Sequence, residues 1–144
     1  MNGDNFMEIT VTQAQGLVPI SVVTPHGALD ASSYKNLIQK GQELHSAGTR
    51  YLLLDLSETT FMSSAGVVAL HTIALMLRGE ELPDSESGWE AYKKIDRDRD
   101  TGKQKYLKLL NPTPNVDKIL TMTGFKNILE VHNDLEEAVA SFDL

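Results

Sequence analysis

The sequence predicts one mixed α/β domain. Short apolar runs of strand length alternate along the chain with longer segments in which apolar residues recur at helical spacing. One run, residues 51–56, is apolar except for Asp55, and such runs are typical of a strand covered on both faces of a parallel or mixed sheet. We therefore expect a sheet of about five strands with helices mainly on one face, in the order β-β-α-β-α-β-α-β-α.

Composition limits the possible functions. The chain has 144 residues, 41% of them hydrophobic, which suits a single folded domain over residues 1–144. The net charge of −7 argues against nucleic acid and anionic membrane surfaces as partners. With no cysteine, disulfides and thiolate chemistry are excluded. Neither a signal peptide nor an apolar run long enough to cross a membrane is present, so we expect a cytoplasmic protein without membrane insertion.

The first half of the chain contains three predicted strands and two predicted helices. Residues 6–13 alternate between polar and apolar, and residues 18–24 form a second strand, so the two predict a hairpin. Asp30 precedes a helical segment, residues 31–47, and is expected to cap it. After the buried strand 51–56 we expect a polar turn over residues 57–62, and then an apolar helix that begins near Ser63 and Ser64 and stops at Gly79.

The second half begins with a segment of different composition. Residues 80–103 are rich in charge and turn residues, and we interpret them as an acidic insertion. Its alternating Asp96, Asp98 and Asp100 lack the glycine and glutamate of a calcium loop, so a solvated charge run is expected. Apolar spacing and turn residues predict four further elements. These are a strand over residues 104–110, a helix capped by Asn115, a short strand over 127–131 and a final helix after Asp134.

Ser63 and Ser64 form the candidate site, because they stand where the predicted apolar helix begins. A hydroxyl there can cap the helix, which is the purely structural interpretation of Ser64. Alternatively Ser64 accepts a phosphate, since the amino end of a helix favours an anion and the phosphate adds about −1.5 to −2 charges. Ser63 is either a second acceptor or a solvated turn residue. Asp55 is either a turn carboxylate or part of a surface read by a partner.

The sequence resembles STAS domains at three motifs. These are Leu54-Asp55-Leu56, Phe61-Met62 followed by Ser63-Ser64-Ala65-Gly66-Val67, and the Gly-x-Leu-Asp turn that ends at Asp30. In the anti-sigma factor antagonists of that family the central motif reads aspartate, serine, small residue, glycine, and a partner kinase phosphorylates the serine. The resemblance places Ser64 on that serine and Ser63 where the aspartate usually stands. The surface it implies for the partner consists of Asp55, Ser57, Met62, Ser63, Ser64, Ala65, Gly66 and Val67.

The resemblance implies a regulatory protein, not an enzyme. It would bind an anti-sigma factor that is also a serine kinase of the histidine-kinase-like ATPase type, and a matching phosphatase would reset it. Two alternatives stay open: a constitutive STAS interaction subunit of a transport or lipid-trafficking complex, which Ser63 in place of aspartate favours, and a small-ligand-sensing module. We expect no cofactor, and the four histidines show no metal-ligand spacing. The oligomeric state is left open.

Overall fold

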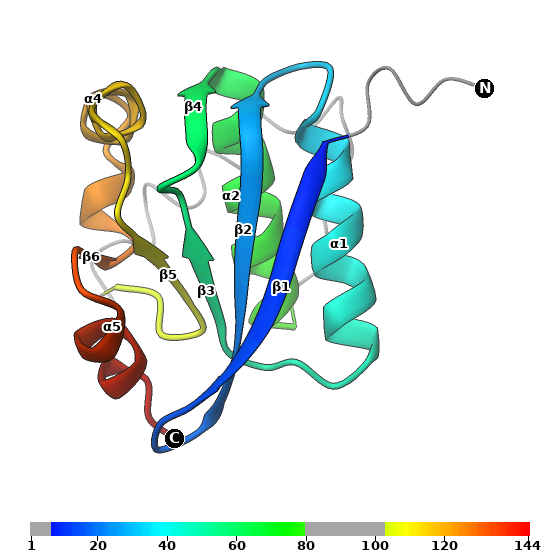
Figure 1. Ribbon diagram of the computed structural model, residues 1–144, viewed down its shortest axis with the longest axis vertical. Helices are drawn as coiled ribbons and strands as arrows, with labels where there is room; N and C mark the ends of the chain where they lie inside the picture. The colour runs from blue at the N-terminus through cyan, green and yellow to red at the C-terminus, as the bar shows by residue number, and fades with distance from the viewer. Residues whose placement is uncertain (1–6, 80–102) are drawn as a thin grey trace.

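A six-stranded sheet forms the centre of the structure, a computed structural model that describes residues 7–79 and 103–144 (Figure 1). The strands are β1 (Glu8–Gln15), β2 (Pro19–Leu29), β3 (Leu52–Asp55), β4 (Thr59–Met62), β5 (Leu107–Leu110) and β6 (Val131–His132). The helices are α1 (Tyr34–Ser46), α2 (Ser64–Leu77), α4 (Pro114–Met122), the 3-10 turn η3 (Phe125–Asn127) and α5 (Leu135–Ser141). The mixed α/β fold class is thereby confirmed.

The strand order is β1-β2-β3-β5-β6. β1 and β2 form the predicted antiparallel hairpin, whereas β3, β5 and β6 pair in parallel. The long strand β2 has two partners on the same side: β3 pairs with residues 21–23 and β4 pairs further along, with residues 27–29. The carboxyl ends of β2 and β4 therefore reach the same end of the molecule, at the top of Figure 1.

Two separate clusters of apolar side chains pack against the two faces of the sheet. The inner cluster is the larger, and α1, α2 and α4 contribute to it through buried residues such as Leu37, Leu70 and Leu120. The outer cluster joins Ile20, Leu53 and neighbouring side chains to α5. The helices thus cover mainly one face, as the apolar patterns predict, and α5 lies in front of the sheet in Figure 1.

The strand β4 was not predicted, because the sequence analysis assigned residues 57–62 to a polar turn. Thr59 and Met62 are buried, at 0% and 2% exposure, while Thr60 and Phe61 between them are exposed. Only the segment 57–58 forms the turn. The register between β2 and β4 shifts at Gly27, whose φ of 107° lies in the left-handed region that favours glycine. The extra residue at this shift is Thr60 on β4, which lies between the partners of Gly27 and Ala28.

Several predicted boundaries were wrong by a few residues. α1 begins at Tyr34 rather than near residue 31, and its N-cap position is occupied by Ser33 rather than Asp30. α4 begins at Pro114, so Thr113 stands at its N-cap and Asn115 lies inside the helix. Proline suits the first turn of a helix because its missing N–H has no partner there.

The end of the chain follows the prediction more closely. The predicted strand over residues 127–131 is replaced by η3 and the two-residue strand β6. Asp134 caps α5, since its carboxylate accepts the Glu137 N–H at 2.9 Å, as the capping spacing predicts.

The predicted insertion, residues 80–103, lies outside the described residues except for Lys103. Among the helices that the structure describes, none has both the length and the apolar character needed to span a bilayer.

Candidate functional site

The turn from β4 into α2 carries the two serines of the candidate site. Ser63 is the N-cap of α2, and its Oγ accepts the Ala65 N–H at 3.1 Å. The Ser63 carbonyl accepts the N–H groups of Gly66 and Val67 at 2.9 and 3.2 Å. Ser64 is the first residue of the helix, and its side chain is exposed to solvent.

These bonds correct the structural interpretation of Ser64, because Ser63 supplies the cap. They also reduce the number of backbone N–H groups that could bind an anion at this turn. Three N–H groups of the first helical turn already bind Ser63, so fewer of them are free than the sequence analysis assumed. What remains for a phosphate on Ser64 is the positive end of the helix dipole, which favours negative charge.

Gly66 fixes the start of α2 against the end of β2. A Cβ on Gly66 would lie 2.6 Å from Met62 Cγ and 2.9 Å from the Leu29 carbonyl oxygen. That oxygen already accepts the Ser63 N–H at 3.0 Å. A glycine is required here because two backbones approach closely, and the contact sets how far Ser64 stands above the sheet.

Asp30 organises the neighbouring loop between β2 and α1. Its Oδ1 accepts the Ser32 N–H at 2.9 Å and the Ser32 hydroxyl at 2.7 Å. The hydrogen bonds from Ser32 lower the pKa of the Asp30 carboxyl, so it stays ionised. The Ser33 hydroxyl donates to the Ala28 carbonyl at 2.7 Å and closes the same loop. Asp30 therefore stabilises the turn before the helix, and it does not cap the helix itself.

The predicted partner surface separates into exposed and buried residues. Met62, Gly66 and Val67 are buried, so they support the site from below and cannot contact a partner directly. Ser64 is exposed, while Ser63 and Ala65 are half-buried. These three residues are the part of the predicted surface that the turn presents to solvent.

Phe61 belongs to one of the family motifs but was not included in the predicted partner surface. Its side chain is 50% exposed on β4, beside the turn. No periodic signal in the sequence marks it, because the extra residue Thr60 breaks the alternation of buried and exposed residues expected of a strand. Once β4 is taken as a strand, Phe61 belongs to the surface next to Ser64.

Asp55 and Ser57 lie apart from this surface. Leu54, next to Asp55, pairs with Val23 on β2, whereas Met62 pairs with Leu29, so Leu54 and Met62 are separated by roughly 20 Å at ~3.3 Å per strand residue. Ser57 lies in the turn at the opposite end of β4 from Ser63. Asp55 Oδ1 accepts the Ser57 N–H at 3.0 Å and thus closes the turn before β4. The geometry favours the turn interpretation of Asp55.

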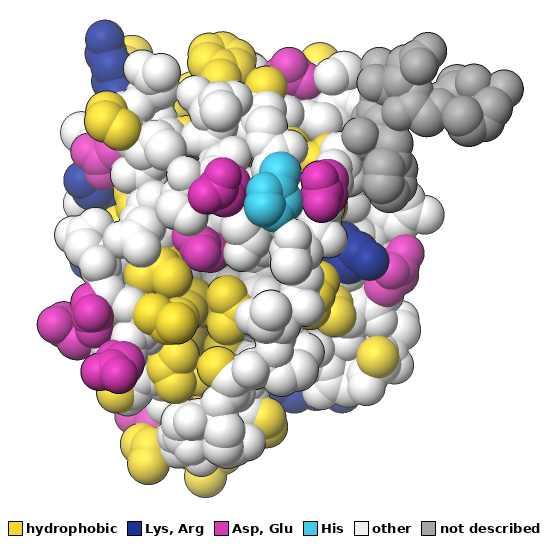
Figure 2. Space-filling model, viewed as in Figure 1, with side chains coloured by type: hydrophobic (Ala, Val, Ile, Leu, Met, Phe, Trp, Pro, Cys, Tyr) yellow, Lys and Arg dark blue, Asp and Glu magenta, His cyan; other side chains and the backbone are white. Residues whose placement is uncertain are grey.

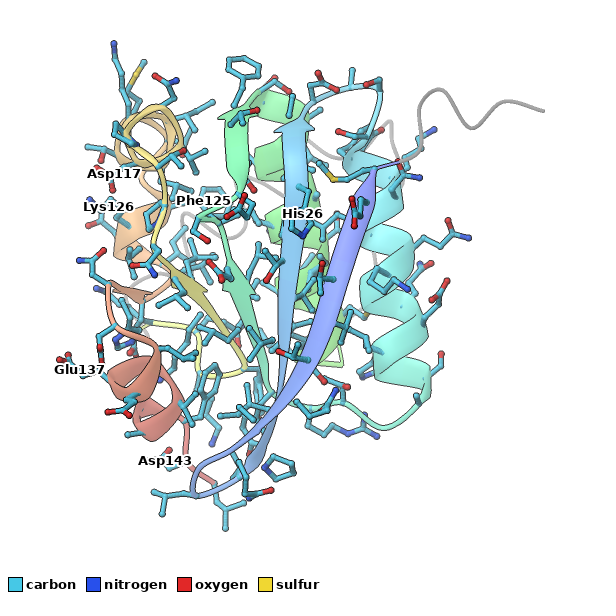
Figure 3. The ribbon with its side chains drawn as sticks, viewed as in Figure 1. His26, Asp117, Phe125, Lys126, Glu137 and Asp143 are labelled. Carbon is cyan, nitrogen blue, oxygen red and sulfur yellow. The ribbon has the colours of Figure 1, made fainter. Side chains whose placement is uncertain are left out.

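The outer face of the sheet carries a second polar group around His26, which Figure 3 labels on β2. The His26 imidazole lies 2.7 Å from the Thr10 hydroxyl, and Glu8 stands opposite it on β1. Acidic side chains flank the ring on the face seen in Figure 2. Within residues 7–79 and 103–144, no three His, Asp or Glu side chains are placed to hold a metal ion.

Solved structures of similar fold include several regulatory proteins. An anti-sigma factor antagonist from Mycobacterium paratuberculosis matches with a TM-score of 0.59 and 20% identity over 93% of each chain. The Bacillus cell fate determinant SpoIIAA in its phosphorylated form matches with a TM-score of 0.50 and 16% identity, over 92% of this chain and 96% of that one. At these identities the likeness concerns the fold alone.

One further match is to part of a much longer protein. This chain matches SLC26A9 with a TM-score of 0.54 and 16% identity, over 91% of its own length but only 23% of that chain. A comparison with curated proteins gave no match.

The sequence itself identifies the family. The model of the STAS domain matches residues 9–81, which run from β1 through the Ser63–Ser64 turn and the whole of α2. The matched segment includes the Gly66 contact, which positions the start of α2, and the Asp30 loop before α1. The chain belongs to the STAS domain family.

Proposed function

We propose that this protein is an anti-sigma factor antagonist that is controlled by phosphorylation of Ser64. In the unphosphorylated form it binds a switch kinase of the histidine-kinase-like ATPase type, and a sigma factor is released. Phosphorylation of Ser64 ends that binding, and a matching phosphatase resets the protein in the cytoplasm. The observation that carries this proposal is the exposure of Ser64 at the first residue of α2, beside a neighbour that already caps the helix.

The physical basis is a change of surface charge that leaves the core in place. A phosphate adds about −1.5 to −2 charges. At the amino end of a helix the dipole favours this charge, so the fold tolerates it. A partner whose surface covers Ser64 and the exposed Phe61 ring has to desolvate the phosphate, which disfavours binding. Ser63 is less suited as an acceptor, because its oxygen is already engaged by the Ala65 N–H.

The test is phosphorylation by purified candidate kinases with ATP, followed by mass spectrometry of the peptide that contains residues 63–66. We expect phosphate on Ser64 in the wild type and in Ser63→Ala, and none there in Ser64→Ala. Binding to the same kinase, measured by calorimetry, should weaken in Ser64→Asp and persist in Ser64→Ala. Phosphate found only at another residue, or unchanged binding by Ser64→Asp, would contradict the proposal.

A second function is favoured by one departure from the family motif. Ser63 stands where the aspartate usually lies, and an uncharged residue there suits a constitutive interaction subunit of a transport or lipid-trafficking complex. The fold it shares with a segment of SLC26A9 is compatible with this alternative. The discriminating experiment is a pull-down against purified membrane ATPase subunits. Binding that is the same for the wild type and for Ser64→Asp would favour this function over the switch.

A further inference from the structure

Three apolar side chains hold the last helix to the sheet: Ala138, the partly buried Val139, and Phe142, whose ring lies edge-on to Tyr51. Within α5 only Ala138 is buried, and the ring of Phe142 after the helix is buried as well, each at 0% exposure. Leu135, at the start of α5, is 49% exposed. Figure 2 shows hydrophobic side chains beside the position of α5, and the members of the outer cluster itself are at most 7% exposed while α5 is in place.

A buried lysine makes the polar contact between the sheet and the end of α5. Lys108 lies on β5 and is only 3% exposed. Its Nζ donates to the Ser141 carbonyl at 2.9 Å, to the Ser141 hydroxyl at 3.1 Å and to Glu130 Oε2 at 3.1 Å. It also lies 4.9 Å from the centre of the Phe142 ring. An ammonium has three N–H donors, and here each has an acceptor.

This arrangement makes the closed position of α5 depend on all three bonds of the Lys108 ammonium. Removing an ammonium from water is costly unless every donor is paired, and a buried ion pair often yields little net stabilisation. When α5 moves away, the Lys108 ammonium loses both Ser141 acceptors but returns to water, whereas Glu130 is already 35% exposed. A helix of seven residues is also unstable by itself, so an opened α5 would lose its helical hydrogen bonds.

The inner and outer clusters are independent in their membership. α1, α2 and α4 contribute buried side chains to the inner cluster, whereas α5 contributes only to the outer one. The removal of α5 from the sheet would therefore leave the larger cluster intact. Local opening of this kind is typical of segments with few buried apolar contacts.

We propose that α5 is a C-terminal latch that opens as one unit while the inner cluster stays packed, and that the Lys108 ammonium fastens it. The latch goes beyond the control of Ser64, because α5 and α2 lie on opposite faces of the sheet. Its opening uncovers the apolar outer face around Ile20 and Leu53.

A second contact allows the latch to be opened without a change at Lys108. The tip of the β1–β2 hairpin lies against α5 at Gly16, where a Cβ would stand 2.9 Å from both the Val139 carbonyl oxygen and Val139 Cγ1. Because one of these atoms is backbone, Gly16→Ala has to push α5 away from the hairpin. This variant retains the lysine and its partners.

The test is amide hydrogen exchange followed by mass spectrometry on the full chain. Wild type, Lys108→Met, Gly16→Ala and the exposed control Lys118→Met are compared, with urea added in steps below the unfolding transition. Loss of bonds to a charged group is expected to speed exchange in residues 135–142 by about tenfold or more in Lys108→Met. Gly16→Ala should show the same effect and Lys118→Met none, and in each protein residues 135–142 should exchange faster, and with a weaker dependence on urea, than residues 67–77 of α2.

Two results would overturn the latch. In the first, amides of residues 135–142 in the wild type exchange no faster than those of α2, and their exchange rate increases with urea as steeply as that of α2. α5 would then open only when the whole chain unfolds. The other is unchanged exchange of residues 135–142 in both Lys108→Met and Gly16→Ala. If Lys108→Met fails to fold, the exchange rates of residues 135–142 in the wild type and in Gly16→Ala are compared with those of α2 in the same way.

Discussion

Gly66 of α2 lies directly against Leu29 of β2, so that a Cβ on Gly66 would stand 2.9 Å from the Leu29 carbonyl oxygen. The same oxygen accepts the Ser63 N–H at 3.0 Å. One backbone atom of β2 therefore fixes both the cap and the first turn of α2. The glycine of the family motif has a packing role here, and the exposed Ser64 takes its position from that contact.

Gly66→Ala should destabilise the protein. The added methyl group meets Leu29 backbone and Met62 Cγ, and such overpacking typically costs about 1–3 kcal/mol. This cost opposes the ~1 kcal/mol by which alanine is favoured over glycine inside a helix. Urea unfolding monitored by circular dichroism measures the net change. Ser64→Ala on the same turn is the control and should have little effect, whereas a Gly66→Ala variant at least as stable as wild type would show that the approach of the two backbones is not constraining.

Ser63→Ala should cost about 0.5–2 kcal/mol, the usual loss when a capping hydroxyl is removed. Its Oγ is the acceptor for the Ala65 N–H, and no methyl group can replace it. Ser63→Asp should recover this loss, because a carboxylate can accept the same bond and also interacts favourably with the helix dipole. Thermal unfolding of the three proteins at low and high salt measures both effects.

The salt dependence separates the two contributions of aspartate at this position. Its dipole interaction weakens as salt is added, while the hydrogen bond of the cap persists. If Ser63→Ala unfolded at the wild-type temperature, the cap assigned to Ser63 would be energetically unimportant.

The pH dependence of stability should show the contribution of Glu130. Burial raises the pKa of its carboxyl, but hydrogen bonds from His132 and Lys108 outweigh burial, and the pKa is lowered in the folded state. A lowered carboxyl pKa stabilises the fold above the unfolded value, roughly 4.3, and this stabilisation is lost as the pH falls through the folded value. The difference in unfolding free energy between wild type and Glu130→Gln should thus be present at pH 7 and shrink below pH ~4.3.

Glu136→Gln provides the matched control, because Glu136 is exposed on the adjacent helix. Urea unfolding from pH 7 to pH 3 gives the three curves. A constant difference between wild type and Glu130→Gln over this range would mean that the Lys108 contact does not depend on the charge of Glu130.

The sequence predicted the elements whose signals are local. The buried strand β3, the apolar helix α2 and the cap at Asp134 depend on apolar runs, spacing and short-range hydrogen bonds, and each is present. The exposed position of Ser64 follows from the same local pattern. The acidic insertion and the extent of the single domain stay predictions.

What could not be predicted depends on contacts between segments distant in the sequence. β4 is short and polar in sequence, and it becomes a strand because β2 continues beyond the end of β3 and pairs with it. Lys108 interrupts an otherwise apolar strand, a pattern that indicates a buried charge, but its partners in Glu130 and Ser141 come from later elements. Thr113 likewise binds a residue far back in the chain.

Thr113→Val should loosen β4 from α4. The Thr113 hydroxyl donates to the Thr59 carbonyl at 2.8 Å, and Thr59 is fully buried on β4. Valine keeps the shape of the side chain but leaves that carbonyl without this donor, which typically costs about 1–3 kcal/mol. We expect lower stability to urea together with faster amide exchange in residues 59–62, because within residues 7–79 and 103–144 β4 pairs with β2 alone. Thr60→Val, at an exposed position of the same strand, is the control and should change neither quantity. The contrary result would be unchanged amide exchange of β4 in Thr113→Val together with altered exchange in Ser63→Ala. In that case the contact with α2 would hold β4 in place, and the hydrogen bond from Thr113 on the α4 side would not contribute to the position of Ser64.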